Sequence, residues 1–474
     1  MVSPRPTTGR HASRPTSNWI PFGAVLIIVA LLCYLAAWAR GDETARGLVI
    51  GPLVVVACVP WVLRVRESGR AFDLAGILVA AIGAKLIGVY ARYWMVVSLY
   101  DGVGDSTGYD TYGRRFAPLF RSLNFDVDPD RPIPGTGWPR VLTGIVYAIF
   151  GSDRFTGFII YGMLALIGCW FFYRAVETAL PEADHRRYAL LVFFWPSLVF
   201  WPSAIGKEAW MIFSLGIASY GAALLFRQRP YGILVLGLGI AGAALPRPHI
   251  AIVVLAAAAI GFFVAATFGG GESGSAAGLA TRILGVLFLL GAGALLAPKV
   301  ATFLNIDDVG GSGFTDTLDE VQRRTSQGGS GFTPAEINTP LDYPWAAVTV
   351  LFRPFPFEVS SAATAISALE GLLLASLMAI SARRILRLPS GLVQHAYVAY
   401  AAAFAFMFVY VFAFIGNFGI LARQRAQLLP FLFVLVALLP TRRRIDAEST
   451  ARRPDLPPGT THTAPALAPP RART

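Results

Sequence analysis

A short acidic run holds the residues in this chain that are best suited to catalysis. It reads Gly104-Asp105-Ser106-Thr107-Gly108-Tyr109-Asp110 and follows directly after a long apolar stretch. Carboxylates beside membrane hydrocarbon are costly and are usually retained for function. A carboxylate can also accept a proton from a sugar hydroxyl within hydrogen-bonding distance. We therefore take Asp105 and Asp110 as the candidate catalytic residues, with Asp105 also a candidate ligand for a divalent cation such as Mg²⁺ or Mn²⁺.

The two aspartates differ in their neighbours along the sequence. Asp110 lies four residues before Arg114, so these two side chains can pair on one helix face, and a structural role for Asp110 is the alternative to a catalytic one. Asp105 has no basic residue close to it in the sequence, whereas Tyr109 is at helical spacing from it. Asp105 is therefore the better candidate for a general base.

Basic residues recur at four turns that we expect on the same face as the acidic run. They are Lys207 beside Glu208, Arg247 beside His249, Arg353 near Glu358, and Arg423 with Arg425 on a loop after Asn417. Arginine and lysine at such turns suit the binding of phosphate. The structural alternatives are that Lys207 and Glu208 pair with each other and that Arg247 snorkels out of a tight turn.

The composition of the 474-residue chain is that of an integral membrane protein. Hydrophobic residues make up 55% and charged residues only 14%, and the mean hydropathy is +0.58, whereas soluble proteins carry roughly 25% charged residues. The net charge of +12 does not predict nucleic acid binding, because the arginines lie in short loops between apolar segments and no nucleic-acid-binding motif occurs. The expected partners are membrane lipids.

The apolar stretches predict an all-α fold, a polytopic transmembrane helix bundle of about 12 spans. The candidate spans are 19–39, 47–63, 73–99, 154–174, 188–204, 208–226, 231–246, 249–267, 282–298, 362–382, 391–415 and 426–440. Two further apolar segments, 138–150 and 344–352, are too short to span, and we expect them to lie at the interface or to re-enter the membrane.

Clusters of arginine in alternate loops predict that both termini are cytoplasmic, since cytoplasmic loops are rich in Lys and Arg. The cytoplasmic ends would be the segment 1–18 and a disordered tail, 441–474, rich in Pro, Thr, Ala and Arg. The membrane domain, 19–440, would then present two long loops, 100–140 and 299–343, on the outer face of the plasma membrane. The second loop is expected to be either a flexible connection or a lid over a site.

Two charged residues and a proline-containing repeat fall inside predicted spans. Lys85 and Glu370 are opposite in charge, so they are expected either to form a buried pair or to act in substrate passage. The repeat reads Phe194-Trp195-Pro196-Ser197 and then Phe200-Trp201-Pro202-Ser203. Proline interrupts the hydrogen bonding of a helix, so the backbone can bend around a cavity here.

Three features of the sequence resemble the GT-C superfamily of membrane glycosyltransferases. They are the pattern Gly-Asp-x-x-x-Tyr at Gly104, Asp105 and Tyr109, the aromatic helix after it and the Arg-bearing turns. This resemblance implies transfer of a sugar from a polyprenyl-phosphate carrier to an acceptor glycan, lipid or protein on the outer face. The acidic run follows the third span here, whereas in the family it usually follows the first; two extra N-terminal helices would account for this. The residues expected to hold the donor phosphate are Lys207, Arg247, His249, Arg353 and Arg425. The wider set of substrate-binding residues adds Tyr109, Arg114, Glu208, Glu358 and Arg423.

Two other functions fit parts of the sequence. Cell-surface polysaccharide polymerases and O-antigen ligases also have about twelve spans, a long late outer loop and essential outer arginines, and the segments around Arg353 and Arg425 are similar to theirs. A polymerase or ligase would depend on these late arginines, and a transferase on the early carboxylate. A non-catalytic transporter or flippase is the third possibility, but neither an internal repeat nor matching interrupted spans occur in the sequence.

Overall fold

The computed structural model describes residues 43–268, 283–296 and 331–438, apart from 69, 71, 336, 338 and 387. In these residues the regular structure is helical and no strand occurs; a single isolated bridge joins Gly331 to Asn417. The predictions for 1–18, for the span 19–39, for most of the loop 299–343 and for the tail 441–474 fall outside the described residues.

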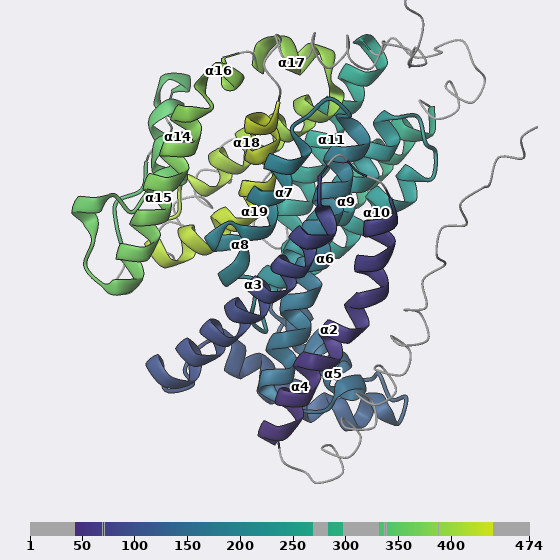
Figure 1. The fold of residues 1–474 in the computed structure, drawn as a ribbon, viewed down its shortest axis with the longest axis vertical. Helices are drawn as coiled ribbons and strands as arrows, with labels where there is room; N and C mark the ends of the chain where they lie inside the picture. The colour runs from purple at the N-terminus through teal and green to yellow at the C-terminus, as the bar shows by residue number, and fades with distance from the viewer. Residues whose placement is uncertain are drawn as a thin grey trace, which may run out of the picture. The chain divides into compact units, whose positions relative to one another are not determined.

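Seven helices in the described part of the chain are long and apolar enough to cross a membrane (Figure 1). They are α2 (Glu43–Glu67), α3 (Leu74–Trp94, continued by the π-helix η1, Met95–Leu99), α6 (Arg154–Ala179), α9 (Lys207–Phe226), α11 (Pro248–Phe268), α15 (Ala362–Ile380) and α19 (Phe418–Ala437). Three shorter apolar helices are α10 (Gly232–Ala244), Ile283–Leu296 and α18 (Ala396–Phe412). The helical fold is thus confirmed and the seven apolar helices support a membrane protein, while twelve spans and cytoplasmic termini stay predictions.

The remaining helices are short and lie between these elements. They are α4 (Asp105–Arg121), α5 (Gly137–Phe150), α7 (His185–Phe194), α8 (Pro196–Phe200), α14 (Tyr343–Phe352), α16 (Ala382–Ile385), α17 (Leu388–Gln394) and the 3₁₀ turns η2 (Pro340–Asp342) and η3 (Pro356–Glu358). The apolar segments 138–150 and 344–352 form the helices α5 and α14, and their position at the interface or within the membrane stays a prediction. The first packs along α4, and the second lies against α15 and α18.

The centre of the bundle is the packed pair α6 and α9, with α19 beside them. Gly168 of α6 and Gly216 of α9 face each other so closely that a side chain at either position would overlap the backbone of the other helix. Small residues at such crossings let membrane helices approach closely, which raises their van der Waals contact. The neighbouring helices α2, α3 and α10 pack against this pair.

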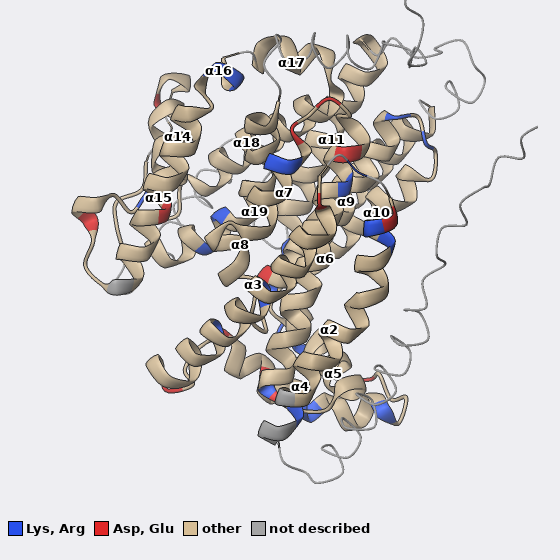
Figure 2. Ribbon diagram, in the orientation of Figure 1, with Lys and Arg blue, Asp and Glu red and all other residues tan. Residues whose placement is uncertain are grey.

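Lys and Arg occur at both ends of the bundle (Figure 2), and two of the arginine-bearing loops lie where α6 ends. Arg70, between α2 and α3, lies 2.6 Å from Glu177 at the end of α6. Arg384 of α16 lies 3.5 Å from Asp184, which precedes α7. These two loops, both expected on the cytoplasmic side, therefore share one end of the described bundle. The acidic run lies at the other end, where α6 begins.

The predicted span 188–204 is broken into α7 and α8. The break is at Trp195-Pro196, because proline has no N–H to continue the hydrogen bonding of α7. The last predicted span also differs from the expectation. It begins at Phe418 rather than near residue 426, because Asn417 caps α19 by accepting a hydrogen bond from the Ile420 N–H at 3.1 Å.

Lys85 and Glu370 do not pair with each other, so the predicted buried pair is wrong. Both side chains bind α8 instead. The Lys85 Nζ donates to the Leu198 carbonyl at 2.6 Å. Glu370 accepts from the Ser197 N–H at 2.9 Å and also from the Ser197 hydroxyl. Each charge thus satisfies backbone groups that the break leaves open, and both are buried, at 2% and 8% exposure.

Candidate functional site

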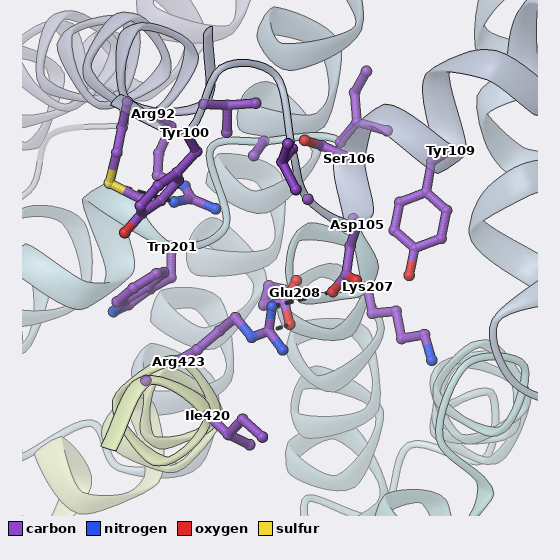
Figure 3. Close-up of a pocket in the computed structure, with 18 of the residues that line it drawn as sticks. Arg92, Tyr100, Asp105, Ser106, Tyr109, Trp201, Lys207, Glu208, Ile420 and Arg423 are labelled. Carbon is purple, nitrogen blue, oxygen red and sulfur yellow. Dashed lines mark hydrogen bonds and ion pairs between the residues drawn. The ribbon is translucent and has the colours of Figure 1, made fainter. Parts of the chain in front are cut away.

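One pocket of about 490 Å³ gathers half of the predicted site residues (Figure 3). It lies where α3 ends and α4, α9, α11 and α19 begin. Its charged lining residues are Arg92, Asp105, Lys207, Glu208, Arg247 and Arg423. Four cationic side chains against two carboxylates leave a surplus of positive charge. Helix starts carry a positive partial charge as well, so the pocket is suited to an anion.

Asp105 is the first residue of α4 and presents its carboxylate to the pocket. Gly104 before it has φ 149°, a conformation that residues with a side chain rarely adopt. The Asp105 side chain is 67% exposed, and its ion-pair partner is Arg423, with Nη1 3.3 Å from Oδ2. The acid is therefore accessible to a bound molecule while one arginine holds it in place.

Glu208, the second residue of α9, is bound by two arginines. Its Oε1 lies 3.1 Å from Arg247 Nη2 and 3.3 Å from Arg423 Nε, and its side chain is only 12% exposed. The alternative in which Lys207 pairs with Glu208 is wrong, since Lys207 Nζ donates to the Thr136 hydroxyl at 3.0 Å. Asp105, Arg423, Glu208 and Arg247 thus form one continuous chain of opposite charges.

Arg423 was expected on an outer loop, but it lies in the second turn of α19. The sequence analysis placed the start of this helix too late because Arg423, Gln424, Arg425 and Gln427 lower the local hydropathy. All four residues lie on the helix, and Arg423 is the one that reaches the pocket. From this position its guanidinium bridges two carboxylates on two other helices.

The other late arginine, Arg425, lies outside the pocket. It is buried at 1% exposure, and its Nη1 donates to the carbonyls of Leu351, at 2.5 Å, and Arg353, at 3.1 Å. Arg425 thus fastens α19 to the end of α14. Its expected role at the donor phosphate has no support from this placement.

Arg353 and His249 also lie outside the lining of the pocket. Arg353 pairs with Glu358 at 2.6 Å, and its guanidinium carbon lies 4.3 Å from the centre of the Phe332 ring. His249, in the first turn of α11, is half-buried and lies against the Phe412 ring. The structure therefore separates Arg353 and Glu358 from the pocket cations, whereas His249 lies close enough to Arg247 and Lys207 to interact with their charges.

Asp110 faces away from the pocket and into the contact between α4, α5 and α6. Its carboxylate lies 3.2 Å from Arg114 Nε and 3.1 Å from Arg154 Nη2 and accepts from the Tyr147 hydroxyl at 2.5 Å. The predicted pair with Arg114 is confirmed. Burial and the adjacent Asp110 charge raise the pKa of the Tyr147 phenol, so it stays a neutral donor. Asp110 and Arg114 thus have the surroundings of structural residues.

Arg92 is a pocket residue that the sequence analysis missed. It lies in the last turn of α3, and its guanidinium carbon is 5.1 Å from the ring centres of both Phe200 and Trp201. An arginine at the end of a span that was expected to face outward, against the usual charge bias, was the available signal. Tyr109 also lines the pocket, and burial, with the Asp105 charge, raises the pKa of its phenol.

A metal site built by the protein alone is absent from the described residues. No group of three or more His, Cys, Asp or Glu side chains lies together there. The guanidinium of Arg423 also already lies between the carboxylates of Asp105 and Glu208. The expected divalent cation stays a prediction, and no step below depends on it.

Comparisons with known proteins add no relative to this picture. No family model, no curated protein and no solved structure matches the chain. The resemblance to the GT-C superfamily therefore rests on Gly104, Asp105, Tyr109 and the Arg-bearing turns alone, and it stays a prediction.

Proposed function

We propose that this protein is a membrane glycosyltransferase that moves a sugar from a polyprenyl-phosphate carrier to an acceptor hydroxyl on the outer face of the plasma membrane. The observation that carries the proposal is the exposed Asp105 carboxylate in a pocket with surplus positive charge, at one end of an apolar helix bundle. An acid for proton transfer and cations for phosphate are the two groups that this reaction needs.

In this proposal the donor phosphate binds at the starts of α9 and α11, between Lys207 and Arg247. Arg247 is 7% exposed, and its Nη1 has no hydrogen-bond partner within the described residues. An unsatisfied buried guanidinium nitrogen is costly, so a phosphate oxygen from the substrate would relieve this cost. The start of α9 carries no side-chain cap, which leaves its positive end directed at the same region.

The proposed reaction is a single displacement. The acceptor hydroxyl oxygen attacks the anomeric carbon of the donor sugar, and the bond from that carbon to the phosphate oxygen breaks. The leaving lipid phosphate keeps the electron pair, and Asp105 takes the hydroxyl proton. Lys207 and Arg247 stabilise the negative charge that develops on the phosphate, and such preorganised charge is usually the largest contribution to the rate.

The placement of two of the three late arginines supports a transferase over a polymerase or ligase. The alternative depends on Arg353, Arg423 and Arg425; Arg353 and Arg425 have protein partners outside the pocket, whereas Arg423 lines it. By contrast, Asp105 is the pocket carboxylate that is open to a substrate. A polymerase or ligase that used the same pocket would have to rely on Arg247 and Arg423 instead.

The test is sugar transfer by protein reconstituted in liposomes with a panel of polyprenyl-phosphate sugars. Asp105→Asn is expected to lower the transfer rate by about 10²- to 10⁴-fold, the usual contribution of general base catalysis, while donor binding is retained. Asp126→Asn is the matched control, because Asp126 is an exposed aspartate outside the pocket. Unchanged transfer by Asp105→Asn would remove Asp105 from the mechanism. Lipid movement across the bilayer without transfer would favour a transporter.

A further inference from the structure

The four cations of the pocket fall into two kinds. Arg247 and Arg423 are neutralised by Glu208 and Asp105. In the part of the chain that the structure describes, Arg92 and Lys207 have no carboxylate partner. Arg92 contacts a methionine sulfur and two aromatic rings, and Lys207 contacts a threonine hydroxyl. The surplus positive charge of the pocket therefore resides on Arg92 and Lys207.

These two cations lie on opposite sides of the carboxylates. Figure 3 shows Arg92 together with Trp201 and Tyr100 on one side of Asp105 and Glu208, and Lys207 on the other side. Asp105 thus lies between two separate positive positions. A single phosphate would occupy one of them and leave the other without an anion.

Charge balance supports two anionic ligands rather than one. A sugar linked to a lipid by a phosphodiester carries one negative charge, whereas the lining contains two more cations than carboxylates. The Nε of Arg92 is buried and has no hydrogen-bond partner within the described residues. A partly buried cation that forms no ion pair with a carboxylate is unfavourable, so a second anion is expected at Arg92.

The two sides differ in what surrounds the charge. The Lys207 side adds the second cation Arg247, which suits the several oxygens of a phosphate. The Arg92 side adds the aromatic rings of Trp201 and Tyr100, and Tyr100 is 47% exposed. Flat apolar faces beside one positive charge suit a sugar ring that carries a single acidic group.

We infer that the acceptor substrate is itself anionic and binds through Arg92 over Trp201, opposite the donor phosphate at Lys207 and Arg247. This inference rests on the proposed transferase function. The acceptor hydroxyl then lies between the two positions, next to Asp105. The acidic group is either the carboxylate of a uronic acid or a phosphate on a lipid-linked glycan, since a guanidinium binds both.

The experiment compares methyl β-glucuronide with methyl β-glucoside, which differ at the carboxylate, as ligands of the purified protein and as acceptors in transfer. We expect the glucuronide to bind with a Kd about tenfold lower, the usual gain from one charge-assisted hydrogen bond. Arg92→Gln should abolish this preference without changing the KM for the donor, and Arg92→Lys should restore part of it. Lys207→Gln should instead raise the KM for the donor.

The outcomes separate this inference from the proposed function. If both sugars bound equally well, or were acceptors with equal KM, the inference of an anionic acceptor would be overturned. The transferase proposal would remain. A glucuronide preference that depends on Arg92, without any transfer, would keep the anion site and reject the transferase. If farnesyl phosphate bound at the Arg92 position and the glucuronide did not, the site would be assigned to a lipid-linked phosphate. Arg115→Gln, an exposed arginine of α4 outside the pocket, is the control and should match the wild type; folding of each variant is checked by its melting temperature.

Discussion

Asp105 and Asp110 belong to the same helix and are five residues apart, yet their surroundings differ almost completely. Asp105 is 67% exposed and pairs with one arginine, whereas the Asp110 side chain is 4% exposed and is held by two arginines and a tyrosine. The difference arises because α4 is amphipathic: Asp110 faces α5 and α6, and Asp105 lies at the open helix start. A carboxylate whose hydrogen-bond and ion-pair partners all lie inside the protein stabilises the fold. A carboxylate with few such partners can interact with a substrate.

A second pair of charges sharpens this comparison. Lys85 and Glu370 lie inside spans and are fully satisfied by the backbone and hydroxyl of α8, whereas Arg92 and Lys207 in the pocket have no carboxylate partner within the described residues. Charges in the membrane interior must be satisfied by the protein, because lipid offers no hydrogen bonds. Charges at the end of the bundle can remain open to a substrate.

The largest loss of stability is expected for Asp110→Ala. The substitution leaves Arg114, Arg154 and the Tyr147 hydroxyl without their shared acceptor, and breaking such a buried pair costs about 3 kcal/mol. The measurement is the thermal unfolding of the purified variant in detergent. An unchanged melting temperature would contradict the structural role given to Asp110 and reopen a catalytic one.

Glu370→Ala is expected to have the next largest effect. It removes the acceptor for the Ser197 N–H and hydroxyl at the break between α7 and α8, at a cost of about 2 kcal/mol. Glu370→Gln is the matched variant, because an amide oxygen can still accept one of these hydrogen bonds, and it should recover about half of the loss. Equal unfolding temperatures for both variants would show that the hydrogen bonds to α8 contribute nothing.

Tyr147→Phe should cost less, about 1 kcal/mol, because it removes one hydrogen bond to Asp110 and leaves both arginines in place. The control is Tyr112→Phe, which removes a hydrogen bond to the exposed Asp130 and should be nearly neutral. Thermal unfolding again gives the answer. If the two variants lost the same stability, burial would not distinguish these hydrogen bonds.

The smallest loss of stability is expected for Asp105→Asn, within about 0.5 kcal/mol of the wild type, since exposed ion pairs contribute little. The same variant is expected to lose sugar transfer, so its stability and activity should separate. A melting temperature that fell as far as in Asp110→Ala would mean that Asp105 also stabilises the fold, and the contrast between the two aspartates would fail.

The sequence by itself determined the class of protein and the local pairs. Hydropathy and helix length are properties of contiguous residues, so eleven of the twelve predicted spans correspond to helices of the described structure, although the span 188–204 is broken and the last one starts earlier. The pair Asp110–Arg114 was predictable because i,i+4 residues are neighbours in any α-helix. Three of the four basic segments singled out in the sequence also contribute a cation to the pocket: Lys207, Arg247 and Arg423.

Only the tertiary structure decided which charges meet. Asp105 and Arg423 are 318 residues apart, and no local pattern encodes their contact, because it depends on α4 and α19 reaching the same end of the bundle. For the same reason Lys85 and Glu370 bind α8 rather than each other, and Arg425 fastens two helices while Arg423, two residues earlier, reaches the pocket. Side-chain type sets what a charge can bind, but helix packing sets which partner is within reach.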